Sequence, residues 1–134
     1  MTNHFVHHLC IQTNTYLETL RFYTEGLGFK IVQESPDFHG RNFNTWLQLE
    51  GFYIELQTGK CNEILTDGNT NSQGLSHFCL WVQDLNAEVI RLRELGTEFI
   101  LKNNEYIYYV ENGSLCKIKA PEGTIVELRD NRGI

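Results

Sequence analysis

Two histidines and two glutamates stand at matching places in this sequence of 134 residues. His8 lies within the apolar segment VHHLCIQT, and His77 lies within the similar segment LSHFCLWV. Each histidine is followed by a glutamate inside another apolar segment, Glu55 in FYIELQT and Glu127 in TIVELRD. A buried carboxylate without a partner is costly. Two imidazoles and two carboxylates that converge in a cavity suit an octahedral divalent ion, with two positions left for water or substrate.

The alternation of side chains along a strand predicts which neighbours share a face with these residues. Successive side chains point to opposite sides of a sheet, so Cys10 shares the face of His8. In the same way Cys79 shares the face of His77. The two cysteines are interpreted as a small apolar wall, with a nucleophile or a redox pair as the less favoured alternative. His7 is predicted to point the other way, towards the surface or an interface.

The segments that must position these residues form an internal repeat. Each histidine segment is followed by a helical pattern that ends at a glycine. The first pattern begins at Thr15, which forms a candidate capping box with Glu18, and it ends at Gly26 or Gly28. The second begins after Asp84, which is predicted to be its N-cap.

Strand-like segments follow each helix, and the glutamate lies in the last strand of each copy. They are 28–34, 44–50 and 52–58 in the first copy, and 97–102, 106–111, 115–119 and 124–129 in the second. Segment 106–111 is interpreted as the counterpart of 44–50, and 97–102 as the counterpart of 28–34. The sequence therefore predicts an α+β fold with two tandem β-α-β-β-β modules, whose curved mixed sheets surround a cavity.

The two modules are predicted to form a single domain over residues 1–134. Module one covers about 5–58, and module two covers about 75–130. The segment 59–74 is rich in Gly, Asn, Asp and Thr and is interpreted as the linker. One module alone would have a one-sided sheet and too small a core. Two modules, in one chain or across a dimer, are therefore expected to curl their sheets around a shared cavity.

Three further polar residues have open roles. His39 and Arg41 lie in the segment SPDFHGRNFN, which is predicted to be a solvated loop, although either residue is a candidate for substrate contact. Arg129 follows Glu127 by two residues and is expected to pair either with an anionic substrate or with an acidic neighbour.

Composition limits the partners and the compartment. The net charge is −6 and no cluster of Lys and Arg occurs, which disfavours a nucleic-acid partner. No apolar run reaches the roughly 18 residues of a membrane-spanning helix, and the N-terminal segment lacks the features of a secretory signal. The four cysteines include no CxxC pair and are interpreted as reduced thiols. A cytoplasmic location is therefore expected.

Five short segments give the sequence a specific resemblance. VHHLCI, FYTEGLGF, IEL, GLSHFCLWV and APEGTIVEL occur in order over nearly the whole chain. Together they resemble the vicinal oxygen chelate superfamily, which includes glyoxalase I, methylmalonyl-CoA epimerase, extradiol dioxygenases, fosfomycin-resistance thiol transferases and bleomycin-binding proteins. Ala120 stands where the family's last motif usually has Asp. The resemblance implies the glyoxalase-like fold of this superfamily.

The resemblance also implies a metal site and an assembly. The family's metal positions correspond to His8, Glu55, His77 and Glu127, which is the glyoxalase I-like set. One divalent ion per chain is expected, and Zn, Ni, Co, Mn and Fe all remain open. Relatives of this length commonly form homodimers, so the site is expected either within one chain or shared between two.

The activity that the resemblance implies is that of a lyase or isomerase. The enzyme would abstract a proton next to a carbonyl of a small substrate that chelates the ion, with the metal stabilising the charge that develops. Glu127 is the better candidate base, with Glu55 opposite it. Glutathione-using glyoxalases carry Arg and Asn where this chain has Gln12 and Gly59, which disfavours a glutathione adduct. The alternatives are an extradiol-type dioxygenase and a metabolite- or antibiotic-binding resistance protein without catalysis.

Overall fold

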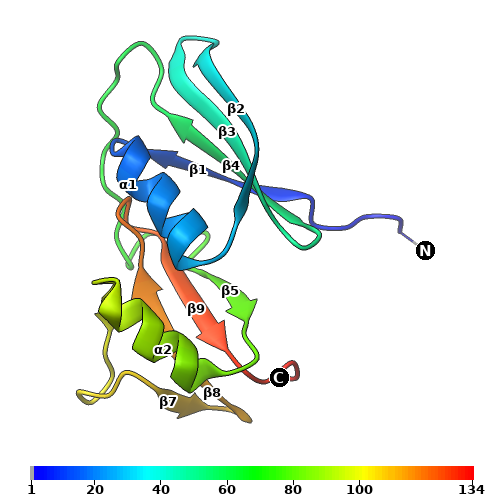
Figure 1. The fold of residues 1–134 in the computed structure, drawn as a ribbon, viewed down its shortest axis with the longest axis vertical. Coiled ribbons are helices and arrows are strands. Elements are labelled where there is room, and N and C mark those ends of the chain that lie inside the picture. The colour runs from blue at the N-terminus through cyan, green and yellow to red at the C-terminus, as the bar shows by residue number, and fades with distance from the viewer. Residues whose placement is uncertain (1) are drawn as a thin grey trace. The chain divides into compact units, whose positions relative to one another are not determined.

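The computed structural model describes residues 2–134, and the chain divides into two compact units, residues 1–67 and 68–134 (Figure 1). The boundary falls within the predicted linker 59–74. Each unit contains one mixed sheet and helical turns, which confirms the α+β class and the β-α-β-β-β arrangement.

The sheet of the first unit has the strand order β1-β4-β3-β2. The elements are β1 (His8–Thr13), α1 (Tyr16–Arg21), the π-helix η1 (Phe22–Gly26), β2 (Lys30–Phe38), β3 (Arg41–Leu49) and β4 (Phe52–Thr58). β1 and β4 are parallel, and the other pairs are antiparallel. The last strand of the unit therefore lies between the first and the third.

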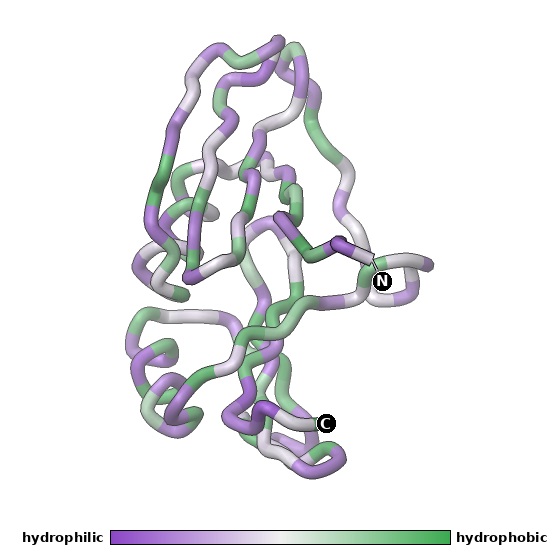
Figure 2. Tube along the Cα trace, turned by 90° about the vertical axis from the view of Figure 1, so that its right-hand side faces the viewer, coloured by the Kyte–Doolittle hydropathy of each residue, from purple (hydrophilic) through white to green (hydrophobic). Residues whose placement is uncertain are grey.

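The core of the first unit lies between this sheet and the helix. Tyr16 and Tyr23 recur at helical spacing on α1 and η1, and both are buried. The sheet contributes Leu47, Ile54 and Leu56, which are fully buried. Side chains of the opposite parity on β1 and β4 point away from this core, and these include the candidate ligands. Figure 2 shows the resulting alternation of polar and apolar segments along the strands.

The helix of the first unit begins differently from the prediction but ends at the predicted glycines. Thr15 occupies the N-cap position, but no side chain forms a capping hydrogen bond there, so the capping box with Glu18 is wrong. The second half of the helix is a π-helix, in which the amide of Leu27 donates to the carbonyl of Phe22 at 3.1 Å. Gly28 follows with φ +83°, a conformation that favours glycine, and it ends the helix.

The predicted loop 35–44 is wrong, because most of it belongs to strands. β2 continues to Phe38 and β3 starts at Arg41, so that only His39 and Gly40 form the turn. Both turn residues have positive φ, 48° and 82°, as a tight hairpin of the I′ type requires. β2 is an edge strand, where Pro36 is tolerated because no neighbour needs its missing N–H.

The sheet of the second unit repeats this order as β5-β9-β8-β6, with β7 pairing to β8. The elements are β5 (Phe78–Trp81), α2 (Leu85–Glu94), β6 (Glu98–Ile100), β7 (Tyr108–Val110), β8 (Gly113–Lys119) and β9 (Ile125–Arg129). β5 and β9 are parallel. By position in the sheet the counterpart of β3 is β8, so the assignment of 106–111 to that place is wrong, whereas β6 does take the place of β2 at the outer edge.

The helix of the second unit follows the prediction closely. The carboxylate of Asp84 accepts a hydrogen bond from the amide of Ala87 at 3.0 Å, which confirms it as the N-cap. Gly96 follows the helix with φ +78°. Leu85, Val89 and Leu92 form the buried face of α2. None of the helices within residues 2–134 is long and apolar enough to cross a membrane.

Candidate functional site

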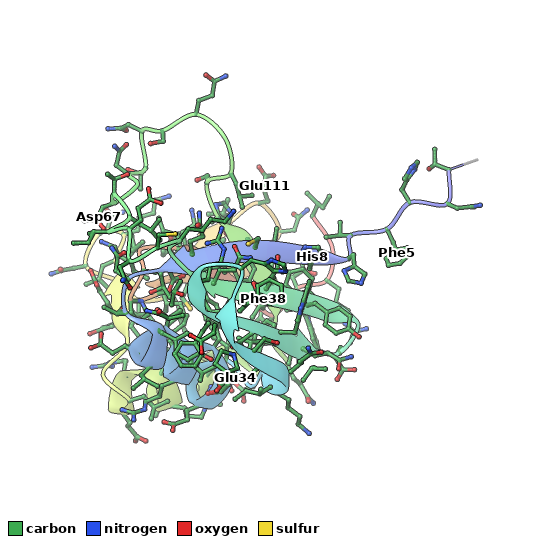
Figure 3. The ribbon with its side chains drawn as sticks, turned by 90° about the horizontal axis from the view of Figure 1, so that it is seen from above. Phe5, His8, Glu34, Phe38, Asp67 and Glu111 are labelled. Carbon is green, nitrogen blue, oxygen red and sulfur yellow. The ribbon has the colours of Figure 1, made fainter. Side chains whose placement is uncertain are left out.

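His8 and Glu55 come together on the face of the first sheet that is opposite the core. The parallel register of β1 and β4 places Cys10 beside Glu55, and His8 beside Tyr53. The Nε2 atom of His8 lies 3.9 Å from Oε1 of Glu55. Figure 3 shows His8 at the start of β1, after the extended segment that carries Phe5. Residues separated by 47 positions in the sequence thus form one imidazole and carboxylate pair.

His77 and Glu127 form the same pair in the second unit. The parallel register of β5 and β9 places Cys79 beside Glu127. The Nε2 atom of His77 lies 3.7 Å from Oε1 of Glu127. Glu127 is buried, with 7% of its surface exposed. His77 directly precedes β5, so its place beside Glu127 is shown by the distance between the two side chains and not by strand alternation.

A side-chain network that the sequence did not reveal holds Glu55. The amide nitrogen of Asn44 on β3 donates to Oε2 of Glu55 at 3.3 Å. Gln57 donates to Oδ1 of Asn44 at 2.7 Å, and the thiol of Cys10 donates to Oε1 of Gln57 at 3.3 Å. Asn44 is 1% exposed. Asn44 lies where the predicted loop 35–44 meets the predicted strand 44–50, and only the strand register could have indicated its role.

His7 is exposed, as predicted, but the prediction that it points away from His8 is wrong. The Nδ1 atoms of the two rings are 2.9 Å apart, which is a hydrogen-bond distance. The ring of His7 also stacks on Tyr53, with centroids 5.2 Å apart and an interplanar angle of 19°. β1 begins only at His8, so the alternation rule does not extend to His7. Its ring occupies the Nδ1 side of His8, while Nε2 of His8 faces Glu55.

The two thiols beside the carboxylates are protonated at neutral pH. Burial, followed by the charge of Glu55, raises the pKa of Cys10 to about 11. Burial and then hydrogen bonding to Glu127 raise the pKa of Cys79 to about 12. Because the thiolate is the nucleophilic form, these values favour a wall of the site over a nucleophile.

The structure separates Arg41 from His39. Nη1 of Arg41 donates to Oε1 of Gln12 at 3.1 Å and to the carbonyl of Thr58 at 2.6 Å, which places a guanidinium at the end of β1 and β4. His39 is exposed in the hairpin turn, where its ring contacts Phe38 edge to face. Arg41 therefore lies next to the site face, and His39 does not join it.

Each unit presents a pair of donors that fits part of a metal coordination sphere. Bonds of about 2.0 to 2.2 Å from one ion to nitrogen and oxygen place neighbouring ligands roughly 3 Å apart or slightly more. The separations of 3.9 and 3.7 Å are longer than this value, so the side chains would have to move closer together to share an ion. Within residues 2–134 no group of three or more His, Cys, Asp and Glu side chains is assembled. One unit thus provides two donors of the types that a divalent ion accepts.

Several solved structures have the same fold. A glyoxalase family protein from Enterococcus faecalis is 22% identical, with a TM-score of 0.79 over 97% of this chain and 100% of that chain. The trypanothione-dependent glyoxalase I of Leishmania major is 19% identical, with a TM-score of 0.73 over 96% of this chain and 87% of that chain. TnmS3, an antibiotic-binding protein from Streptomyces sp. CB03234, is 19% identical, with a TM-score of 0.66 over 97% and 98%. The fold therefore carries both catalysis and binding.

The sequence match is as extensive as the structural one. The sequence model described as Glyoxalase/Bleomycin resistance protein/Dioxygenase superfamily matches residues 5–128, which include both pairs of candidate ligands. The chain belongs to the glyoxalase/bleomycin resistance protein/dioxygenase superfamily.

Proposed function

We propose that this chain is a metal-dependent lyase or isomerase of the superfamily, which acts on a small substrate that chelates the ion through two adjacent oxygens. The observation that carries the proposal is the duplicated donor pair. Each unit brings an imidazole and a carboxylate to within 4 Å of one another, at 3.9 and 3.7 Å. The pairs lie at equivalent pairs of parallel strands, with His8 as the first residue of β1 and His77 directly before β5. Together His8, Glu55, His77 and Glu127 would hold one divalent ion per chain, supplied by the two units of one chain or by units of two chains.

The proposed reaction is proton abstraction next to a carbonyl. When bound, the ion would polarise the carbonyl and stabilise the negative charge that develops as the proton leaves. Glu127 would take the proton and return it as a general base and acid. Asn44 fixes one oxygen of Glu55, whereas no side-chain amide holds Glu127 in the described part of the chain. Glu127 is preferred as the base because of the family resemblance, and the thiol of Cys79 hydrogen-bonds to it.

Metal analysis of protein purified without a histidine tag tests the proposal. We expect about one equivalent of divalent metal per chain in the native protein, and a large loss in His77→Ala and Glu127→Gln. His39→Ala is the matched control, because His39 is exposed in the hairpin turn and makes no contact with either pair. Metal content that stays a small fraction of one equivalent after reconstitution would rule the proposal out.

Substrate assays separate this activity from the other activities of the superfamily. The proposed enzyme exchanges the proton next to a carbonyl with solvent deuterium, and Glu127→Gln stops the exchange. Oxygen consumption with catechols that survives Glu55→Gln would instead support a ring-cleaving dioxygenase. Ligand binding by the metal-free protein, without turnover, would support a binding protein.

A further inference from the structure

Arg129 forms no ion pair within residues 2–134. It lies on β9, two residues beyond Glu127 and on the same face, opposite Trp81 on β5 and Leu115 on β8. Its Nε atom is buried and has no hydrogen-bond partner within residues 2–134. Burying part of a charged group without a partner is unfavourable. A bound group that accepts hydrogen bonds from the guanidinium of Arg129 would offset this cost.

The first unit shows how the same position is satisfied when the chain provides the partners. Gln57 stands two residues beyond Glu55 and lies opposite Asn44. Its amide donates to Asn44 and accepts from Cys10, so both ends of the amide are bonded. In the second unit the position of Asn44 is taken by Leu115, which offers no side-chain acceptor to Arg129. The hydrogen-bonded amide of Gln57 in the first unit thus corresponds to an arginine in the second unit whose Nε has no partner within residues 2–134.

The surroundings of Arg129 favour an anion. Lys117 lies opposite Glu127 on this face, and the guanidinium of Arg132 lies 4.1 Å from the centroid of the Trp81 ring. Gly113 leaves space for the Arg129 guanidinium, because a Cβ there would lie 3.1 Å from Nη2 of Arg129. Three cationic side chains thus surround a face whose metal-ligand pair contributes one carboxylate.

We propose that Arg129 binds an anionic group of the substrate, a carboxylate or a phosphate, at the end remote from the oxygens that chelate the ion. Two residues along a strand span roughly 6 to 7 Å, so this group and the chelating oxygens lie at different ends of the molecule. The substrate class is then a small acid with two adjacent oxygens at one end. The substrate part of this inference rests on the proposed function, whereas anion binding by Arg129 can be measured without it.

Titration of the metal-free protein with inorganic phosphate at constant ionic strength tests the anion site. The readout is the Nε–Hε resonance of Arg129 in NMR spectra, assigned by its loss in Arg129→Gln. We expect this resonance to shift and to saturate, and Arg129→Gln to weaken phosphate binding at least about tenfold, because charge-assisted hydrogen bonds are lost. Arg93→Gln removes the same charge from α2 and should leave phosphate binding unchanged. A parallel titration with acetate shows which anion is preferred.

The outcomes distinguish this inference from the proposed function. Equal phosphate binding by the native protein and by Arg129→Gln would overturn the inference, as would a titration that leaves the Arg129 resonance unmoved. Metal content is measured on the same proteins. Phosphate binding that depends on Arg129, in a protein that takes up no metal, would reject the proposed function and leave the anion site standing.

Discussion

The side-chain amide of Asn44 links the two halves of the polar network in the first unit. It donates to Glu55 and accepts from Gln57, and it is almost fully buried. A buried donor or acceptor that loses its partner keeps the full cost of its desolvation. The position of the Glu55 carboxylate therefore depends on Asn44, which is not itself a proposed metal ligand.

Asn44→Leu should test this dependence. The variant leaves Glu55 and Gln57 without their shared partner, so we expect the free energy of unfolding to fall by about 1 to 3 kcal/mol. Metal affinity should fall about tenfold or more, as for other residues that orient metal ligands. Urea denaturation and metal competition measure the two effects. Asn42→Leu is the control, since Asn42 is exposed on the same strand; equal losses in both variants would contradict the assigned role.

The contact between the rings of His7 and His8 leads to a second expectation. His7→Ala removes the group that holds the Nδ1 side of His8, so metal affinity should fall about tenfold. His77→Ala removes a proposed ligand itself and should cost considerably more. His4→Ala is the control, because His4 is exposed near the N-terminus. An effect of His7→Ala as large as that of His77→Ala, in metal competition assays, would mean that His7 is itself a ligand.

Gly59 bears on the choice of substrate. A Cβ at this position would lie 2.6 Å from the carbonyl oxygen of Glu63, so the Asn that glutathione-using relatives carry there does not fit. Arg41 does bring a guanidinium to Gln12, from β3. We expect poor turnover of the glutathione adduct of methylglyoxal, because the Asn side chain that would help to bind glutathione cannot be accommodated at Gly59. A measured turnover of about 10² per second or more, within the usual range of enzymes, would restore the strict glyoxalase I assignment.

At the scale of the elements, the periodic segments were predictable and the tight turns were not. The apolar alternation of 6–13 and 52–58 predicts which side of β1 and β4 carries the candidate ligands. The segment 35–44 contains Ser, Pro, Asp, Gly and Asn, which are typical of loops. A hairpin with a two-residue turn uses the same residue types, and only its cross-strand pairs with β3 distinguish it. A local sequence pattern does not show which residues of two strands pair with one another, so it could not predict this hairpin.

The two helix starts provide a matched pair of variants. Asp84 accepts a hydrogen bond from the amide of Ala87, whereas Thr15 makes no capping bond at all. Asp84→Ala should therefore lower the free energy of unfolding by about 1 kcal/mol, and Thr15→Ala by clearly less. Urea denaturation followed by far-ultraviolet circular dichroism measures both. Equal losses would mean that the cap of α2 contributes no more than a surface contact.

At the scale of the whole chain, the repeat predicted the two donor pairs but not the groups around them. His8, Glu55, His77 and Glu127 follow from the periodicity of their strands and from the repeat. Asn44 and His7 do not, because their roles depend on sheet register and on where β1 begins. The sequence marks Arg129 as a candidate for pairing with an anion. That its Nε has no partner within residues 2–134, unlike the amide of Gln57 in the first sheet, is seen only in the structure.

Assembly is the prediction that belongs to this scale. Phe5, Val6, Ile31 and Val32 are at least half exposed, and the last two lie on the edge strand β2. Apolar groups at an open sheet edge are usually covered, so we expect a homodimer. Sedimentation at micromolar concentration measures the state, and a monomer with metal bound would contradict it.

A mixing experiment shows whether the dimer shares its site. Glu55→Gln and Glu127→Gln chains are each expected to bind metal poorly. If each ion takes one donor pair from each chain, some mixed dimers contain one intact set of four ligands and regain metal and activity. If both pairs belong to one chain, mixing restores nothing.

The order of strands in each sheet also sets when a half-site can exist. β4 is the last strand of its unit in the chain, yet it lies between β1 and β3, and β9 lies in the same way between β5 and β8. A protein emerges from the ribosome with its N-terminus first. His8 is therefore made long before Glu55 reaches it, and a nascent chain that stops short of β4 has no donor pair. Metal capture is expected to be a late event in biosynthesis, and chains that terminate before β4 should not compete for the cell's metal.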